Sequence, residues 1–314
     1  MGIWIMARKF TLLGIVLCLA LSTQLPTRAA LVGHWTFDNA DVVGDAVRDV
    51  SGNDLHGTKM NGGPTTSVAG APGFGEAAFF DGGGNNEDNH YVDLSDHIDV
   101  FAELAEGTLA AWVKPVTTEE AGGPDGHLTD VLTIFAASDS FQPSAEMRWV
   151  VHTTTSPFAA GGPGGNVEHG SMYLGVRSAD FSDHLISDVA DQVSLLDGQW
   201  HHVAVTVDGD NSGTMFIDGS QVESYYLDGD AISFMADILP AGPDTVGIGR
   251  NLDSTPGGGQ WFYHGAIDDF RIYDEALDEA AIQLLMTGDT GPMLWAGSSV
   301  QMTENSATRT IPTQ

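Results

Sequence analysis

The segment Gly265-Ala-Ile-Asp-Asp-Phe-Arg-Ile-Tyr273 constrains the fold of this chain more than any other stretch. Its residues alternate with period two, which is typical of a half-buried β-strand. This alternation predicts that Asp268 shares a face with Phe270, and that Asp269 and Arg271 face outward. A carboxylate on a core-facing stripe is costly unless something compensates its charge. A bound metal ion is one compensation, and backbone N–H donors are another.

The sequence between residues 31 and 288 is predicted to be one all-β domain. Short apolar stretches alternate with glycine-rich turns, and the clearest strands are 107–115 and a hairpin formed by 199–208 and 213–219. Many short strands with regular turn signals indicate a sandwich or jelly roll. One helix is predicted after an N-cap at Asp278, and Gly288 supplies its stop signal. We therefore expect a two-sheet antiparallel β-sandwich with one short C-terminal helix.

The two ends of the chain are predicted to lie outside this domain. Residues 1–30 resemble a signal peptide, because Arg8 and Lys9 precede an apolar run at 10–21 that is too short to span a bilayer comfortably. An uncleaved anchor is the alternative, and the length of the run argues against it. Residues 289–314 are polar and without periodicity, which predicts a tail or linker. We expect a secreted or cell-surface protein with no membrane helix after signal cleavage.

Charge and cysteine content narrow the class of partner and the compartment. The net charge is −32, and without the predicted signal peptide 8 basic residues remain against 43 acidic ones, a net charge of −35. Nucleic acid is excluded as an expected partner, because phosphate binding requires clustered Lys and Arg. Divalent cations are compatible partners, although most of the acids are expected to form a solvated surface. The only cysteine, Cys18, lies in the predicted signal peptide, and an exported protein without disulfides points to a bacterial source.

Several short motifs follow one another in a characteristic order. They are Trp35-Thr-Phe-Asp38, Asp49-Val-Ser-Gly-Asn53, Phe80-Asp-Gly82, residues 108–112, Trp200-His-His-Val203, Ile217-Asp-Gly219, Gly247-Ile-Gly249 and the segment 265–273. Each motif is weak alone, but the ordered set resembles the laminin G-like domains of the concanavalin A-like lectin and glucanase superfamily, in their secreted bacterial form. The resemblance implies a jelly roll of two antiparallel sheets that recognises a glycan or a surface protein.

The resemblance also implies a structural calcium ion at one edge of the sandwich. In similar domains the ion joins the loop after the first strand, a turn before an early strand and the start of the last strand. Here these positions are Asp38, Gly75 and Asp268. Carboxylate and carbonyl oxygens are the hard ligands that Ca²⁺ requires. The alternative is that Asp268 caps a turn or accepts backbone N–H bonds. The loop 49–54 is a weaker calcium candidate, since it lacks the terminal Glu of an EF-hand and favours a hydrogen-bonded turn.

Aromatic residues beside loops are the candidates for carbohydrate contact. They are Tyr225, Tyr226, Trp261 and Tyr263. Sugars stack on exposed aromatic faces that are rimmed by polar groups. The competing interpretation is that these rings pack in the core, as aromatic residues in strands usually do.

A catalytic function would need paired carboxylates that flank a sugar. Sandwich glycanases similar to this family carry Glu, Asp and Glu at alternating positions of one strand, and no such run occurs here. Glu146 stands alone, and Glu119 and Glu120 are consecutive in a predicted loop. The sequence therefore predicts a non-catalytic recognition module that binds carbohydrate or a surface protein. A glycan hydrolase or lyase on the same sandwich and a structural or adhesive cell-envelope protein are the alternatives.

Overall fold

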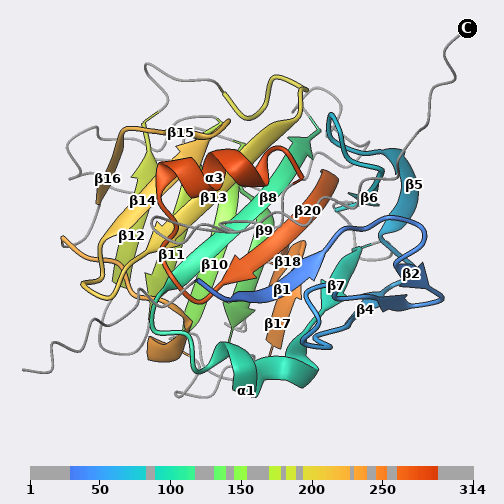
Figure 1. The fold of residues 1–314 in the computed structure, drawn as a ribbon, viewed down its shortest axis with the longest axis horizontal. Helices are drawn as coiled ribbons and strands as arrows, with labels where there is room; N and C mark the ends of the chain where they lie inside the picture. Colours follow the sequence, from blue (N-terminus) through green and yellow to red (C-terminus); the bar gives the residue numbers. More distant parts are fainter. Residues whose placement is uncertain are drawn as a thin grey trace, which may run out of the picture.

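The chain folds into two antiparallel sheets that pack face to face (Figure 1). The structure is a computed structural model, and it describes residues 29–82, 89–116, 131–138, 145–153, 170–177, 182–188, 194–226, 230–238, 245–252 and 260–288. The predicted all-β sandwich is confirmed. The predicted tail at 289–314 lies outside the described residues, as does the predicted signal peptide except for its last two residues.

The first sheet has eight strands and contains both ends of the domain. Its strands are β1 (Leu31–Trp35), β5 (Thr65–Ala69), β6 (Glu76–Phe80), β8 (Gly107–Pro115), β13 (His201–Val207), β14 (Gly213–Ile217), β15 (Ser220–Gln221) and β20 (Gly265–Tyr273). The strand order is β15-β14-β13-β8-β20-β6-β5, and β1 also pairs with β20. The last strand of the chain therefore lies inside the sheet, next to the first.

The second sheet has ten strands. They are β2 (Val42–Val43), β3 (Ala46–Val47), β4 (Gly57–Met60), β7 (Tyr91–Asp93), β9 (Val131–Ser138), β10 (Glu146–His152), β11 (Met172–Arg177), β12 (Ser182–Ser187), β16 (Ser224–Tyr226) and β17 (Thr245–Ile248). The order is β16-β12-β11-β10-β9-β17-β7-β4-β3-β2. A separate hairpin of β18 (Arg250–Leu252) and β19 (Gln260–Phe262) contacts β9.

One hydrophobic core fills the space between the sheets. Alternate residues enter it, so that Trp149 of β10 points inward and Val150 points to the outer face. Phe270 of β20 lies at the centre of an aromatic cluster, with ring centroids 5.5 Å from Phe135, 5.9 Å from Trp35 and 6.4 Å from Trp149. These pairs join both sheets, and aromatic side chains of this size dominate the energetics of a core.

The predicted C-terminal helix is present as α3 (Glu279–Leu285), which lies on the outer face of the eight-stranded sheet (Figure 1). The side chain of Asp278 accepts a hydrogen bond from the backbone N–H of Ala281 at 2.8 Å, as expected for an N-cap. Ile282 is fully buried against a patch of the sheet that includes Ala204. The helix therefore covers the side of this sheet that faces away from the main core.

The structure also contains a second short helix, α1 (Ile98–Phe101), which follows a 3₁₀ turn, η1 (Ser95–His97). Another 3₁₀ turn, η2, spans Met235–Asp237. The sequence analysis did not predict α1, because four residues make barely one turn and give no 3.6-residue periodicity. No helix within the described ranges is long and apolar enough to cross a membrane.

The alternation predicted along β20 is interrupted by a β-bulge. The register with β8 shifts between Asp268 and Arg271, and Asp269 has a φ of 50°. Ile267 and Phe270 both enter the core, so the two aspartates between them both lie on the outer face of the sheet. The prediction that Asp268 shares a face with Phe270 is therefore wrong, because the extra residue of a bulge reverses the alternation. Asp269 and Arg271 do lie on the outer face, but they are 4% and 1% exposed.

Candidate functional site

The outer face of the ten-stranded sheet carries side chains in rows that cross the strands. In one row the register aligns Asp93, Gly247, Ala136, Arg148 and Gly175, on β7, β17, β9, β10 and β11. Glycine and alanine leave the centre of this row low, whereas charged side chains rise from β7 and β10. Because neighbouring strands lie about 4.8 Å apart, the row spans roughly 19 Å. A row of this shape can accommodate an extended ligand across the strands.

The adjacent row is polar at every position. It aligns Thr245, Ser138, Glu146 and Arg177. The Thr245 hydroxyl donates to the Ser138 carbonyl oxygen at 3.0 Å, and Glu146 forms an ion pair with Arg177 at 3.0 Å. Glu146 also lies 3.6 Å from the Nε atom of Arg148. We refer to these two rows, together with the side chains that pack beside them, as the polar sheet face.

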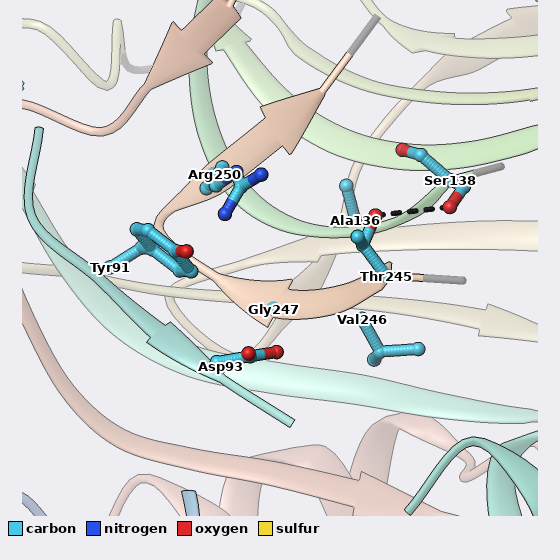
Figure 2. A pocket seen from close by; sticks show the side chains of 8 residues that line it. All are labelled: Tyr91, Asp93, Ala136, Ser138, Thr245, Val246, Gly247 and Arg250. Carbon is cyan, nitrogen blue, oxygen red and sulfur yellow. Dashed lines mark hydrogen bonds between the residues drawn. The ribbon is translucent and has the colours of Figure 1, made fainter. Parts of the chain in front are cut away.

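A small, shallow pocket of about 10 Å³, with room for about one water molecule, lies at one end of the polar sheet face (Figure 2). It is lined by Tyr91, Asp93, Ala136, Ser138, Thr245, Val246, Gly247 and Arg250. The guanidinium carbon of Arg250 lies 4.1 Å from the centroid of the Tyr91 ring, a cation–π geometry. Asp93 is turned toward Ser95, whose N–H and hydroxyl both donate to its Oδ1 atom. The pocket therefore combines a cation, hydroxyl groups and a low floor.

An aromatic cluster lies farther along the same face. The guanidinium carbon of Arg148 is 5.4 Å from the Tyr173 ring centroid and 5.6 Å from that of Trp261. His152 meets Tyr173 edge-on at 5.2 Å between ring centroids. Burial, and secondarily the charge of Arg148, lower the pKa of His152 to about 3. This histidine is therefore neutral at physiological pH, and the positive charge of the cluster comes from arginine.

The four predicted ligand-contacting aromatic residues separate into two groups. Trp261 and Tyr225 are half-buried and pack against the outer apolar cluster of the ten-stranded sheet, next to the polar sheet face. Tyr226 packs instead against the core between the sheets, and its hydroxyl accepts a hydrogen bond from the Gly213 N–H at 2.8 Å.

Tyr263 is fully buried, which contradicts the expectation of an exposed ring. Its backbone N–H donates to the Gly249 carbonyl oxygen at 2.9 Å, and its ring meets Phe80 edge-on in the core. It therefore has no face available for a sugar. Arg148, Arg177 and Arg250 were not among the predicted site residues, although the scarcity of arginine in so acidic a chain is a signal that could have drawn notice.

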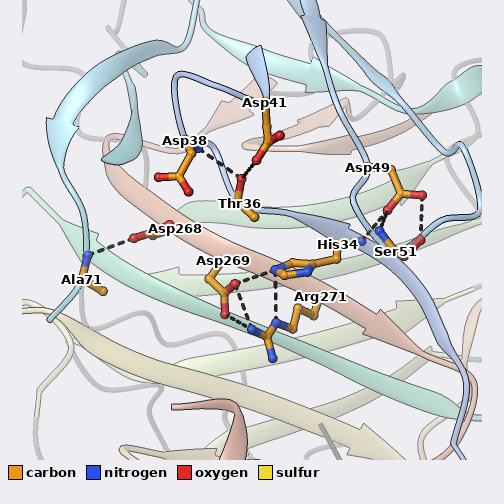
Figure 3. A network of polar contacts seen from close by, with 10 residues as sticks. All are labelled: His34, Thr36, Asp38, Asp41, Asp49, Ser51, Ala71, Asp268, Asp269 and Arg271. Atoms are coloured by element: carbon orange, nitrogen blue, oxygen red, sulfur yellow. Dashed lines mark hydrogen bonds and ion pairs between the residues drawn. The ribbon is translucent and has the colours of Figure 1, made fainter. Parts of the chain in front are cut away.

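Asp38 and Asp268, two of the three residues predicted to bind calcium, lie near each other beside the eight-stranded sheet (Figure 3), and Gly75 packs against Asp38. Asp38 Oδ1 accepts the N–H of Glu76 at 2.7 Å, and Asp268 Oδ2 accepts the N–H of Ala71 at 2.9 Å. A Cβ atom added at Gly70 would lie 2.6 Å from Asp268 Oδ2 and 2.8 Å from the Gly75 carbonyl oxygen, and one added at Gly75 would overlap Asp38 Oδ1. Gly70 and Gly75 thus allow two carboxylates and one carbonyl oxygen to approach the same turn closely.

The electrostatics of this cluster fit a hard cation. Asp268 is 1% exposed. Its burial, reinforced by the negative charges of Asp269 and Asp38, raises its pKa to about 7. Within the described ranges no group of three or more His, Cys, Asp or Glu side chains is arranged as a metal site. An ion held by Asp38, Gly75 and Asp268 would therefore need further carbonyl or water oxygens to reach the six to eight ligands of Ca²⁺.

The loop 49–54 has the geometry of a hydrogen-bonded turn. The Oδ1 atom of Asp49 accepts the N–H groups of His34 and Ser51, and its Oδ2 atom accepts the Ser51 hydroxyl and the Leu55 N–H. Four donors occupy this carboxylate, so its lone pairs are already used. This arrangement is the alternative expected for the loop, an Asx-type turn.

A buried ion network beside the bulge was not predicted from the sequence (Figure 3). Asp269 forms an ion pair with Arg271 at 2.9 Å, and its Oδ1 atom lies 2.5 Å from His34 Nε2. Arg271 Nε lies 3.3 Å from the same His34 nitrogen, which cannot both accept from arginine and donate to the carboxylate. The shorter contact requires a proton between nitrogen and oxygen, so we assign His34 Nε2 as the donor to Asp269. The network links β1 to β20, the first and last strands.

The two-sheet topology and the polar sheet face together define a jelly-roll sandwich of the lectin type. The chain belongs to the Laminin_G_3 family of the concanavalin A-like lectin/glucanases superfamily, whose model matches residues 84–283. A comparison with curated proteins finds no match.

Several solved structures share this fold. Domain 4 of AbnA, an extracellular arabinanase from Geobacillus stearothermophilus solved with arabinotriose, is 21% identical with a TM-score of 0.50, covering 83% of this chain and 100% of that one. The binding domain of Paraclostridial Mosquitocidal Protein 1 is 14% identical with a TM-score of 0.50, covering 82% of this chain and 52% of that one. The CBM40 of the Ruminococcus gnavus IT-sialidase is 17% identical with a TM-score of 0.46, covering 62% and 91%. At these identities the likeness concerns the fold alone.

Proposed function

We propose that this chain is a secreted bacterial carbohydrate-recognition module that binds its ligand on the outer face of the ten-stranded sheet. The observation that carries the proposal is the pocket at one end of the polar sheet face, with Trp261 beside Arg148 farther along it. Ligand sites combine a concave shape with a few converging polar groups, and this pocket has both. The arabinotriose-bound domain of AbnA, which shares the fold, supports a carbohydrate ligand as the first one to test.

A glycan suits this face better than a protein surface does. The centre of a protein interface is enriched in apolar and aromatic side chains and depleted in charge. Here the rows carry hydroxyls, carboxylates and guanidinium groups. The exposed large apolar residues of the described ranges are Val43, Val50, Val100 and Leu284, and none of them lies in these rows. A structural or adhesive role that depends on protein contacts therefore finds less support.

The carboxylates of the polar sheet face are poorly placed for glycoside hydrolysis. Asp93 lies on β7 and Glu146 on β10, with β17 and β9 between them. Three strand spacings separate the two strands by about 14 Å, whereas the carboxyl groups of glycosidases lie about 5–9.5 Å apart. Glu146 also contacts two arginines rather than facing an open cleft. A binding function is thus preferred over the enzyme alternative.

The proposed calcium ion would have a structural role. Asp38 follows β1, Gly75 immediately precedes β6, and Asp268 belongs to β20. An ion bound by these three residues would neutralise two neighbouring buried carboxylates and connect segments that are distant in sequence. Such an ion stabilises the folded state by mass action, because the unfolded chain has no preformed site.

A glycan array probed with the full chain, with calcium and with EDTA, tests the proposal. We expect binding to at least one glycan class, and Trp261→Ala and Tyr225→Ala should each weaken it about tenfold, which corresponds to about 1.4 kcal/mol. Leu284→Ala, on the exposed side of α3, is the control and should bind normally. Absence of binding to every glycan would remove the carbohydrate proposal. Unchanged binding by both aromatic variants would place the ligand elsewhere.

A further inference from the structure

The few basic residues of this chain are concentrated on one surface. The described ranges contain seven Lys and Arg residues, and three of them lie on the polar sheet face or line its pocket. These three are Arg148, Arg177 and Arg250, and the other four are Arg48, Lys59, Lys114 and Arg271. Three positive charges on one face are unusual in a chain with a net charge of −32, and a ligand of opposite charge is one explanation.

Arg250 is positioned to bind an anion in the pocket (Figure 2). Its guanidinium group is stacked on Tyr91, so the planar face of the group is used while its N–H edge lines the pocket. Among the described residues no carboxylate forms an ion pair with Arg250, whose side chain interacts with Tyr91. The charge of Asp93 acts on it, but the hydrogen bonds of that carboxylate come from Ser95.

The guanidinium groups of the face also favour an anion. Arg148 and Arg177 both lie within ion-pair distance of Glu146, and among the described residues that line the pocket of Arg250, Asp93 is the carboxylate. Arginine presents a planar fork of donors that matches a carboxylate or a sulfate through two parallel hydrogen bonds.

We infer that the ligand is an acidic glycan and that its carboxylate or sulfate group binds at Arg250. This inference rests on the proposed function and adds the chemical class of the ligand. The hydroxyls of Thr245 and Ser138 donate to the Ser138 carbonyl oxygen and to Asn251 Oδ1, so their oxygens are left to accept from sugar hydroxyl groups. The small residues Gly247 and Ala136 keep the floor beside Arg250 low. Arg148, farther along the same row, faces the place where the next sugar unit of the glycan would lie. The acidic surface of the protein makes a long polyphosphate backbone a poor alternative.

Two matched pairs of polymers test this inference and separate the two sources of charge. Polygalacturonate is compared with its fully methyl-esterified form, and dextran sulfate with dextran, by affinity electrophoresis of the full chain. Neutral arabinan and xylan complete the set. The buffer contains 0.15 M salt, so that repulsion from distant acids is screened beyond about 8 Å. We expect at least tenfold tighter binding to the charged member of one pair than to its neutral partner.

Three variants make the test specific to Arg250. Arg250→Gln should lose at least tenfold in affinity for the charged polymer, and Arg250→Lys should lose less, because it keeps the charge without the fork. Lys114→Gln removes the same charge from an exposed position on the eight-stranded sheet and should bind normally. Thermal melting shows whether each variant is folded. If Arg250→Gln does not fold, Arg250→Lys is compared with Lys114→Gln. Weaker binding of the charged polymer by Arg250→Lys supports the inference, and equal binding by the two variants contradicts it.

The outcomes separate this inference from the proposed function. Binding to neutral glycans only, or charged-polymer binding that Arg250→Gln and Arg250→Lys leave unchanged, would overturn the acidic-glycan inference and leave a carbohydrate module. Absence of binding to every polymer here and to every glycan on the array would overturn both.

Discussion

Replacing Asp269 with asparagine should destabilise the domain strongly. Asp269 is 4% exposed and pairs with Arg271, which is 1% exposed, at 2.9 Å. Asparagine keeps the size of the side chain and tolerates the left-handed backbone of the bulge, where φ is 50°. The substitution therefore removes the negative charge without imposing a new backbone conformation. It removes the carboxylate that pairs with the buried guanidinium group of Arg271.

The expected loss follows from the cost of an unpaired buried charge. Removing one partner of a buried ion pair costs about 3–5 kcal/mol. For a domain of this size 1 kcal/mol moves the melting temperature by roughly 2–4 °C, so the midpoint should fall by about 6–20 °C. Burial alone would raise the pKa of Asp269, but the hydrogen bond from His34 and the charge of Arg271 outweigh it and lower the pKa. This contribution to stability is therefore present above pH 3.8 and is lost as the pH falls through the lowered pKa.

Urea unfolding followed by tryptophan fluorescence measures the effect at pH 7. Asp210→Asn removes an equal charge from an exposed loop and should change the free energy of unfolding by less than about 0.5 kcal/mol. The double variant Asp269→Asn with Arg271→Met should recover part of the loss, because the orphaned charge is gone. A loss below about 1 kcal/mol for Asp269→Asn, or a double variant less stable than the single one, would refute the reasoning.

Three further predictions concern the other polar clusters. Calcium should raise the melting temperature, by the equivalent of about 2.7 kcal/mol when free calcium is 100 times the Kd. EDTA or the Asp268→Asn substitution should abolish this increase. An identical melting curve with and without EDTA would exclude the calcium site. His201 lies between Asp218 at 2.9 Å and Asp197 at 3.0 Å, and these hydrogen bonds, the one to Asp218 first, outweigh burial and raise its pKa. Its contribution to stability should be complete below pH 6.5 and lost as the pH rises through the raised pKa; an unchanged pH profile for His201→Gln would contradict this. Asp278→Ala removes the N-cap of α3 and should cost about 1 kcal/mol in thermal melts, whereas Glu279→Ala should cost less.

The sequence predicted best those features whose causes are local. The helix α3 was predicted because its N-cap Asp278 and its stop Gly288 are neighbours of the residues they control. The sandwich was predicted because short apolar stretches and the turn signals between them follow one another along the chain. The bulge at Asp268 could not be predicted in this way, since it depends on how β20 aligns with β8, more than 150 residues earlier.

The polar sheet face also could not be predicted from local sequence, because it depends on pairing between distant strands. Arg148, Arg177 and Arg250 are up to 102 positions apart in the sequence, and only strand pairing brings them to one surface. Trp261 and Tyr263 are separated by one residue and looked equivalent as candidates. The structure distinguishes them because the chain after β19 turns into the core, which buries Tyr263 and leaves Trp261 on the outer side.

The position of β20 has a consequence for the order in which the protein can assemble. Of the described strands, β20 is synthesised last, yet it joins β8 on one side to β6 and β1 on the other. Until residues 265–273 have been synthesised, the eight-stranded sheet consists of two separate halves, and pairing across a sequence distance of more than 200 residues is slow. The eight-stranded sheet should therefore be completed late. Such a delay would suit the secretion proposed above, in which a chain crosses a narrow translocation channel before it folds.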